Sequence, residues 1–331
     1  MRPQPVALKK IFDAFQNSTD SQRTYREIIF LQHMEGHENI VHLQQVMRSD
    51  NDRDIYLVFE YMETDLHAAI RANILEPLHK QYVMYQACKA LMYMHSAGLV
   101  HRDLKPANLL LNAECLVKVC DFGLCRTVSD IAKGEEEYTN LTDYVATRWY
   151  RAPEILLASK RYKESVDMWS LGCIFAEMII GRPIFPGTST LNQLERVIEK
   201  IGFPNEAERK ALETQYSKTM LENLTTGPES ARREWRELLP SAPPDAISFV
   251  SRLITWAPEA RLTAEEAIQH AYCAQFHTEG TELKWPEDKP KPAAELKFND
   301  CEKKSAAQYR NALYDNIRDN RELLASRQKL R

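Results

Sequence analysis

The segment from His101 to Asn108, with the sequence HRDLKPAN, limits more than any other feature what this chain can fold into. A short stretch with strand character separates it from Asp121-Phe122-Gly123. Together the two motifs supply the acids, the amide and the lysine that phosphoryl transfer from a magnesium nucleotide requires. Either motif alone can arise by chance, whereas the pair at short range rarely does. The alternative, ordinary core strands with solvated charges, is therefore disfavoured.

This compound motif resembles the catalytic core of protein kinases. The resemblance implies that Asn108 and Asp121 bind Mg²⁺, because a carboxylate and an amide oxygen suit a hard cation. Asp103 is then left to accept the proton of the substrate hydroxyl. Lys105, two residues further along an extended loop, lies on the same side and can reach the γ-phosphate of ATP. A lysine at this position accompanies serine/threonine specificity in the kinases that the chain resembles.

A second cation should hold the other phosphates of the nucleotide. The stretch VALKKI at Val6–Ile11 resembles the kinase strand that carries this lysine, which makes Lys9 the candidate. Its partner should be a glutamate on the next helix, expected over about residues 20–34, and Glu27 is well placed. A strand that ends in exposed lysines is common, so the stretch alone does not identify Lys9 as a nucleotide-binding residue. The assignment depends on the order and distance of Lys9 relative to the HRD and DFG motifs.

The stretch Asp54–Leu66 reads as a buried strand that runs into a polar segment, and it resembles the kinase hinge, which holds the adenine. By that resemblance Phe59 is the bulky residue at the back of the pocket, and the backbone of Glu60 and Met62 meets the base. Asp65 should lie near the ribose, and Leu110 should form the floor under the adenine. Phe59 fits equally well as an ordinary core residue.

The motif order predicts an α+β, two-lobed protein kinase fold. The expected kinase domain spans residues 1–273, with a small mixed N-lobe (1–61), whose sheet is truncated, and a large helical C-lobe (62–273). Periodicity predicts helices over about Ser21–Met34, Leu78–His95 and Val166–Ile180. Residues 274–331 form a C-terminal extension with a linker rich in proline and lysine, at about 284–296, and a helix.

Composition narrows the class of partner. The 331 residues carry a formal net charge of −4 with no basic stripe, which excludes general binding to nucleic acid. No apolar run approaches the length of a membrane span, and the start does not resemble a signal peptide, so membrane insertion is not expected. Protein substrates and docking partners are therefore the expected partners.

The cysteines indicate the compartment. Their number is odd and none forms a CxxC pair, so reduced thiols in the cytoplasm or nucleus fit best. The seven are Cys88, Cys115, Cys120, Cys125, Cys173, Cys273 and Cys301.

Within the kinases, the segment that precedes Ala152-Pro153-Glu154 narrows the resemblance to the mitogen-activated protein kinases. That family carries a threonine and a tyrosine separated by one residue, here Thr142 and Tyr144, followed by VATRWYRAPE. The resemblance implies that both residues are regulatory phosphorylation sites. A phosphate on Thr142 orders a loop only where cations converge on it. Three arginines match those that clasp it in the family: Arg26, Arg102 and Arg126.

Further family contacts follow from the same match. Thr147 should form a hydrogen bond toward Asp103, and Arg148 and Arg151 should meet the phosphotyrosine. The implied substrate is Ser or Thr followed by Pro. Two structural contacts complete the expectation: Glu154 paired with Arg261, and Asp167 holding the backbone of the HRD motif.

The subgroup most like this chain is the atypical ERK seven/eight branch, also called MAP kinase fifteen. Phe59, the acidic stretch Gly134–Tyr138 and the YRxxLY element at Tyr309–Tyr314 carry this resemblance. Kinases of the branch can phosphorylate their own activation segment, so autophosphorylation and a separate upstream kinase are both open.

The C-terminal extension offers two more features. Tyr309, Leu313, Tyr314 and Ile317 share one helix face and should pack onto the lobes. Acidic residues of the preceding linker could attract basic docking peptides: Glu279, Glu282, Glu287 and Asp288.

The kinase pattern ordinarily places two strands and a GxGxxG loop before the lysine of the VALKK stretch, and the printed sequence begins five residues before Val6. Two functional hypotheses follow. The first is an active kinase, because every catalytic position carries a suitable residue. The second is a catalytically impaired scaffold or truncated form that binds partners and handles ATP poorly.

Overall fold

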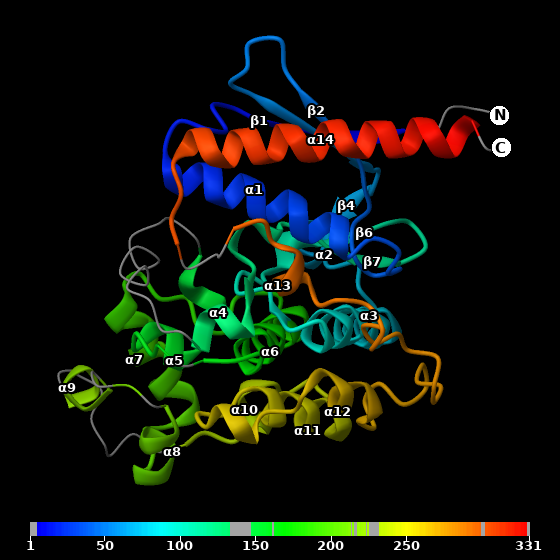
Figure 1. Ribbon diagram of the computed structural model, residues 1–331. Coiled ribbons are helices and arrows are strands. Elements are labelled where there is room, and N and C mark those ends of the chain that lie inside the picture. Colours follow the sequence, from blue (N-terminus) through cyan, green and yellow to red (C-terminus); the bar gives the residue numbers. More distant parts are fainter. Residues whose placement is uncertain are drawn as a thin grey trace.

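The computed structural model describes residues 5–132, 147–160, 162–212, 214, 217–222, 224, 232–298 and 302–329. These residues form a small upper lobe with strands and two long helices, and a large lower lobe dominated by helices (Figure 1). The predicted α+β, two-lobed kinase fold is thus confirmed.

The small lobe contains an antiparallel three-stranded sheet. Its strands are β1 (Val6–Ile11), β2 (Leu43–Arg48) and β3 (Ile55–Glu60), in the order β1-β3-β2, so β1 lies at an edge. Helix α1 (Ser18–His33) starts at Asn17, whose side chain accepts the amide of Asp20 and so satisfies one of the free N–H groups of the first turn. The sheet register places Lys9 opposite Leu57, within reach of α1.

Helix α14 (Ala306–Lys329), from the far end of the chain, completes the core of the small lobe. It lies along α1 on the outside of the lobe (Figure 1). The predicted apolar face is confirmed, since Tyr309, Leu313 and Ile317 are buried against residues of α1 and the sheet. Tyr314 is half-buried and its hydroxyl donates to the carbonyl of Asp52 over 3.3 Å. The small lobe therefore depends on the C-terminal extension for its own core.

Because Leu313 is fully buried, Leu313→Ala should lower the free energy of unfolding by about 2 to 5 kcal/mol. Denaturant unfolding followed by tryptophan fluorescence measures this loss. Arg318→Ala, on the same helix but with a side chain that is 64% exposed, is the control and should change the value by about 0.5 kcal/mol at most. Equal effects from the two variants would contradict the role of α14 in the core.

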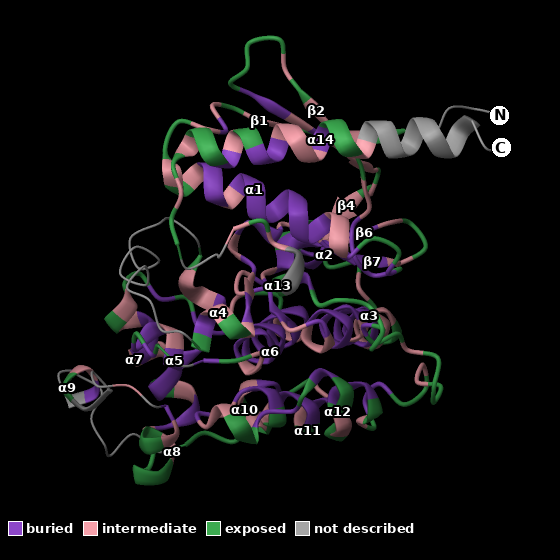
Figure 2. Ribbon diagram, in the orientation of Figure 1, coloured by how far each residue is buried: buried purple, intermediate pink, exposed green. Residues whose placement is uncertain are grey.

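The large lobe is built around two central helices, α3 (Pro77–Ser96) and α6 (Ser165–Ile180), both largely buried (Figure 2). They match the predicted helices to within one residue at each end. Helix α3 starts with proline at its first position, and α6 ends at Gly181, whose φ of 74° favours glycine. The remaining helices are α2 (Leu66–Arg71), α4 (Val128–Ala132), α5 (Pro153–Leu156), α7 (Thr190–Ile201), α8 (Glu206–Ala211), α9 (Ser217–Glu222), α10 (Trp235–Leu238), α11 (Pro244–Leu253) and α12 (Ala264–Gln269).

Two small sheets lie where the lobes meet and carry the site described below. One has the order β4-β6-β7, formed by Thr64–Asp65, Leu109–Leu111 and Val117–Val119. The other pairs β5 (Leu99–Val100) with β8 (Arg126–Thr127). These short ladders hold the loops that contain the two sequence motifs.

The predicted linker is packed rather than free. Trp285 is only 5% exposed, its ring centroid lies 5.5 Å from that of Tyr93, and its amide donates to the Ser96 hydroxyl over 2.7 Å. A short helix, α13 (Pro292–Glu295), follows. The linker therefore fixes the extension to α3 before it reaches α14.

The docking role expected for Glu282 is wrong. Its carboxylate accepts the Tyr85 hydroxyl at 2.9 Å and the Thr278 amide at 3.2 Å, pairs with His277, and is 5% exposed. A carboxylate so engaged offers little charge to a basic peptide.

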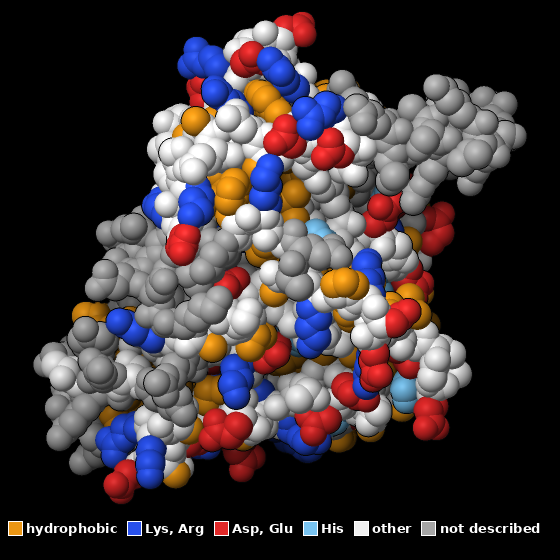
Figure 3. Space-filling view, in the orientation of Figure 1, with side chains coloured by type: hydrophobic (Ala, Val, Ile, Leu, Met, Phe, Trp, Pro, Cys, Tyr) orange, Lys and Arg blue, Asp and Glu red, His pale blue; other side chains and the backbone are white. Residues whose placement is uncertain are grey.

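Charged side chains of both signs are interspersed on the face shown in Figure 3. None of the helices in the described ranges is long and apolar enough to span a bilayer.

Candidate active site

The HRDLKPAN segment forms a compact loop that ends in the short 3₁₀ helix η1 (Pro106–Asn108). The Asp103 carboxylate accepts the Lys105 ammonium at 2.7 Å and lies 3.3 Å from the Asn108 amide nitrogen. That amide nitrogen also donates to the Asp103 carbonyl at 2.8 Å. The acid, the lysine and the amide predicted to act together are thus brought together, and the amide oxygen of Asn108 is directed away from Asp103.

Asp167, in the first turn of α6, holds the backbone of this loop, as predicted. Its fully buried carboxylate accepts the amides of His101 and Arg102, each at 2.8 Å, and the His95 ring nitrogen at 3.0 Å. Burial alone would raise the pKa of Asp167, but the hydrogen bond and charge of His95 and the bond from Arg102 outweigh it and hold the pKa below its usual value. Asp167 stays ionised and keeps Arg102 at its positive φ of 70°.

The DFG motif lies beside the same loop. Asp121 has a φ of 65°, and Phe122 after it is fully buried, with its ring centroid 5.5 Å from that of His101. The His101 ring donates to the Cys120 carbonyl at 3.0 Å. Catalytic loop and DFG motif are therefore locked together through His101.

Lys9 and Glu27 form the predicted ion pair, 2.5 Å between the ammonium and the carboxylate. Burial lowers the pKa of Lys9, but the charge and hydrogen bond of Glu27 and the charge of Asp121 outweigh it and raise the pKa. A Cβ on Gly123 would lie 3.4 Å from Asp121 and 3.9 Å from Glu27, so the DFG turn and α1 meet at this glycine. Lys9, Glu27 and Asp121 thus form one charged cluster.

The hinge residues lie at the junction of the lobes. Asp65 and Leu110 are directly opposite across β4 and β6, and opposed residues share a face of a sheet. Asp65 also caps α2 by accepting the Ala68 amide at 2.9 Å, a structural role that the sequence did not indicate. Phe59 and Met62 are half-buried.

Lys118 is a residue of this region that sequence reasoning missed. Its ammonium lies 3.0 Å from the Glu60 carboxylate and 2.9 Å from the Glu38 carbonyl, to which it donates. The Glu60 carboxylate also accepts the His42 amide at 2.7 Å. Lys118 therefore fixes the end of β3. The sequence signal that could have identified it is a lysine inside the buried strand Val117–Val119.

Asp121 and Asn108 are chemically suited to a divalent cation. The amide nitrogen of Asn108 is used by Asp103, which leaves its oxygen as a ligand, and a carboxylate plus an amide oxygen is a donor set that Mg²⁺ accepts. The described residues contain no group of three or more His, Cys, Asp and Glu side chains arranged to hold a metal. A cation here would complete its shell with phosphate oxygens and water, as in nucleotide sites.

The three predicted phosphate-clasping arginines come from α1, from the catalytic loop and from β8. Burial raises the pKa of Cys125, while the positive charges of Arg102 and Arg26 act in the opposite direction. Both guanidinium groups therefore lie close to the residue that precedes Arg126. Thr142 and Tyr144, the predicted phosphorylation sites, lie outside the described residues.

The segment after Tyr144 differs from expectation at one point. Thr147 is exposed and forms no hydrogen bond with Asp103 within the part of the chain that the structure describes. Asp103 is engaged instead by Lys105 and Asn108, and its charge also acts on Arg151.

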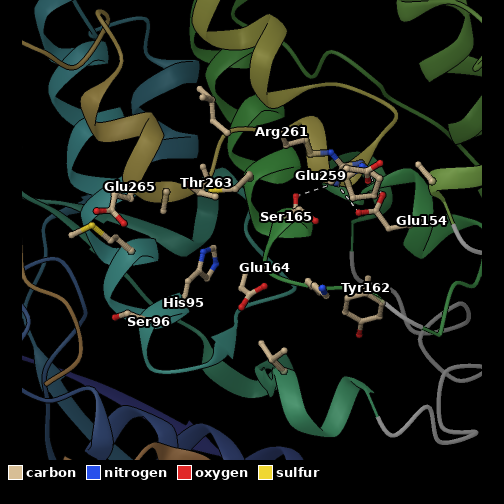
Figure 4. A pocket seen from close by; sticks show the side chains of 18 of the residues that line it. His95, Ser96, Glu154, Tyr162, Glu164, Ser165, Glu259, Arg261, Thr263 and Glu265 are labelled. Carbon is tan, nitrogen blue, oxygen red and sulfur yellow. Dashed lines mark hydrogen bonds and ion pairs between the residues drawn. The ribbon is translucent and has the colours of Figure 1, made fainter. Parts of the chain in front are cut away.

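A pocket of about 1040 Å³ in the large lobe is separate from this cluster (Figure 4). It is lined by residues such as His95, Ser165 and Glu154, and by none of the charged residues predicted to bind ATP. At one side lies the predicted ion pair, in which the Arg261 guanidinium meets both Glu154 oxygens at 2.6 and 2.8 Å (Figure 4).

Comparison with known proteins agrees with this geometry. The family model "Protein kinase domain" matches residues 2–273. Extracellular signal-regulated kinase 2 of Dictyostelium discoideum is 53% identical over 314 residues, covering 95% of this chain and 83% of that protein.

Two further relatives are named mitogen-activated protein kinase 15. That of Xenopus laevis is 48% identical over 332 residues, covering 98% of this chain and 54% of that protein. That of Caenorhabditis elegans is 50% identical over 280 residues, covering 84% of this chain and 59% of that protein. The chain thus spans more than half, but less than two thirds, of these relatives. It belongs to the protein kinase family and, within it, to the mitogen-activated protein kinases of the CMGC group, which are serine/threonine kinases that use ATP with a divalent metal.

Proposed function

We propose that this chain transfers the γ-phosphate of ATP, bound with Mg²⁺, to Ser or Thr followed by Pro in protein substrates. The observation that carries the proposal is the arrangement of Asp103, Lys105 and Asn108 in one hydrogen-bonded loop. The charged cluster of Lys9, Glu27 and Asp121 lies at the DFG turn.

Each residue has a role in that transfer. Asp103 orients the substrate hydroxyl and accepts its proton, and Lys105, already paired with Asp103, offers its charge to the γ-phosphate. Lys9, held by Glu27, binds the other phosphates. Asp121 and Asn108 would hold Mg²⁺, which when bound neutralises charge on the phosphate oxygens.

The adenosine part would lie at the junction of the lobes. The backbone of Glu60 and Met62 would meet the adenine, while Leu110 and Asp65 would lie under the base and beside the ribose. The pairing of Asp65 and Leu110 across β4 and β6 supports this placement.

Activity would be switched by phosphate on Thr142 and Tyr144. Arg26, Arg102 and Arg126 come from three segments that must be aligned for catalysis, and a phosphate of about two negative charges can hold them together. The phosphates could come from an upstream kinase or from autophosphorylation. The six cysteines that the structure describes form no disulfide, in keeping with action in the cytoplasm or nucleus.

A second candidate function is that of a kinase-fold scaffold that handles ATP poorly. It is favoured by the exposure of the edge strand β1, where Val6 and Leu8 are 50% and 59% exposed.

Transfer of labelled phosphate from ATP to a Ser-Pro peptide, compared with a Ser-Ala peptide, tests the proposal. Asp121→Asn should lower the rate by about a hundredfold, because one carboxylate that stabilises the transition state through the metal is lost. The variant should also require more Mg²⁺ for half-maximal rate. Glu114→Gln, an exposed carboxylate in the turn before β7, is the control and should match the parent. No transfer by the parent chain, with or without Mg²⁺, would favour the scaffold.

A further inference from the structure

Four cations from three segments gather at the C-terminal end of α7, away from the catalytic cluster. We call Arg182, Arg196, Lys200 and Arg233 the cationic patch. Arg182 lies two residues after the end of α6, Arg196 and Lys200 belong to α7, and Arg233 lies two residues before α10. Their accumulation stands out because the chain as a whole carries a net charge of −4.

The backbone brings these residues together. Arg196 and Lys200 are four residues apart on α7 and therefore lie on the same face. The amide of Arg233 donates to the carbonyl of Lys200 at 3.2 Å, so their main chains touch. Arg182 comes directly after Gly181, whose positive φ turns the chain at the end of α6.

The cations are only partly neutralised, since Arg233 pairs with Glu237 at 3.8 Å while Lys200 and Arg182 have no such pair among the described residues. Burial lowers the pKa of Lys200, and the charges of Arg233, Arg182 and Arg196 act in the same direction, whereas Glu199 opposes them. Glu199 is already paired with Arg196 at 3.0 Å. Within the described residues, no carboxylate lies within ion-pair distance of Lys200 or Arg182. The patch therefore has positive charge to offer to a ligand.

The patch is held on a rigid support. The Trp256 ring donates to the Gly202 carbonyl at 3.0 Å, and Trp256 itself is buried. A Cβ on Gly202 would lie 2.9 Å from the Arg232 amide nitrogen, so the segment before Arg233 packs closely on the end of α7. Cations that repel one another are thus kept close together by contacts of the backbone.

The other end of α7 contacts Trp149, which follows the predicted phosphorylation sites Thr142 and Tyr144 in sequence. Gln193, in its first turn, donates to the Trp149 carbonyl at 3.3 Å and accepts the Gly187 amide at 3.0 Å. From Gln193 to Lys200 the helix rises roughly 10 Å at 1.5 Å per residue. A polypeptide bound near Trp149 needs only a few more residues to reach the patch.

We propose that the cationic patch binds the phosphate of a phosphoserine or phosphothreonine carried by a protein substrate. Phosphate is favoured over a single carboxylate because it carries up to two charges and three acceptor oxygens, enough for several guanidinium groups and an ammonium. Transfer to a substrate with several acceptors produces such a residue, so one phosphorylated site would recruit the substrate for the next. The proposal rests on the proposed function for its source of ligand, while the binding itself does not require catalysis.

The test uses the full chain and two fluorescent peptides that differ only by a phosphate on one threonine, each with a Ser-Pro acceptor. Fluorescence anisotropy should give at least a tenfold lower Kd for the phosphopeptide, and excess inorganic phosphate should compete. The double variant Arg182→Ala/Lys200→Ala should abolish this preference. Glu199→Ala, on the same helix turn, should keep or increase it because it removes an acid.

Equal binding of the two peptides by the parent chain, or a preference that survives in the double variant, would overturn the proposal. Transfer to the unphosphorylated Ser-Pro peptide is measured in parallel and should be the same in the parent and the double variant. Loss of that transfer in the parent would refute the proposed function alone, since the anisotropy result does not depend on it.

Discussion

Asp103→Asn is expected to reduce phosphate transfer by at least about a hundredfold, because it removes the only carboxylate bonded to Lys105 in the catalytic loop. Asparagine has nearly the same volume and can still accept the Lys105 ammonium through its oxygen, so the loop should keep its conformation. It cannot accept the proton of the substrate hydroxyl. Single-turnover transfer of labelled phosphate to a Ser-Pro peptide measures the loss.

Two controls separate chemistry from folding in this experiment. Thermal unfolding of Asp103→Asn should match the parent, because Asp167, rather than Asp103, holds the backbone of the loop. Binding of ATP should also be unchanged, since Lys9 and Glu27 are untouched. Transfer within threefold of the parent rate would remove Asp103 from the mechanism.

Arg261→Ala is expected to give the largest loss of stability, about 3 to 5 kcal/mol in the free energy of unfolding. The Arg261 side chain is completely buried, and its guanidinium donates to Glu154 and to the carbonyls of Thr255, Ser165 and Trp256. The variant would leave the Glu154 carboxylate buried without its cation. Urea unfolding of the two proteins measures the difference.

A double-mutant cycle tests whether the buried, unpaired charge of Glu154 causes this loss of stability. Glu154→Gln combined with Arg261→Ala should cost less than the sum of the two single changes, because the uncompensated charge is gone. Lys284→Ala breaks an ion pair with Glu265 in which both side chains are 51% exposed, and should cost about 1 kcal/mol at most. Similar losses in the free energy of unfolding for Arg261→Ala and Lys284→Ala would mean that burial does not decide how much an ion pair contributes to stability.

The contacts of the catalytic centre were largely predictable because the sequence places their residues close together or in motifs of fixed spacing. Asp103, Lys105 and Asn108 lie within six residues, so a single loop decides their geometry. The Lys9–Glu27 pair followed from one strand and one helix in sequence. Contacts of this kind depend on local conformation, which motif spacing encodes.

Contacts between distant segments were harder to predict. The apolar face of α14 indicated burial, but periodicity does not say that its partner is α1, nearly 290 residues earlier. The acidic character of Glu282 suggested a surface role, while Tyr85 of α3 and His277 hold it instead. The cationic patch combines Arg182 with Arg233, which no local pattern connects. These features are decided by tertiary packing.

The dependence of the small lobe on α14 imposes an order on folding during synthesis. Strands β1 to β3 and α1 leave the ribosome long before α14, yet part of the core that they need lies between Tyr309 and Ile317. Until that helix emerges, the apolar sides of Ile28, Ile29 and Leu57 lack their partners. The large lobe, whose core is built from segments that precede α14, can fold before α14 emerges, as domains commonly fold in their order of synthesis. The Lys9–Glu27 pair, which joins β1 to α1, would then form only after α14 docks, so a nascent chain would acquire its nucleotide site only once Tyr309 to Ile317 have emerged.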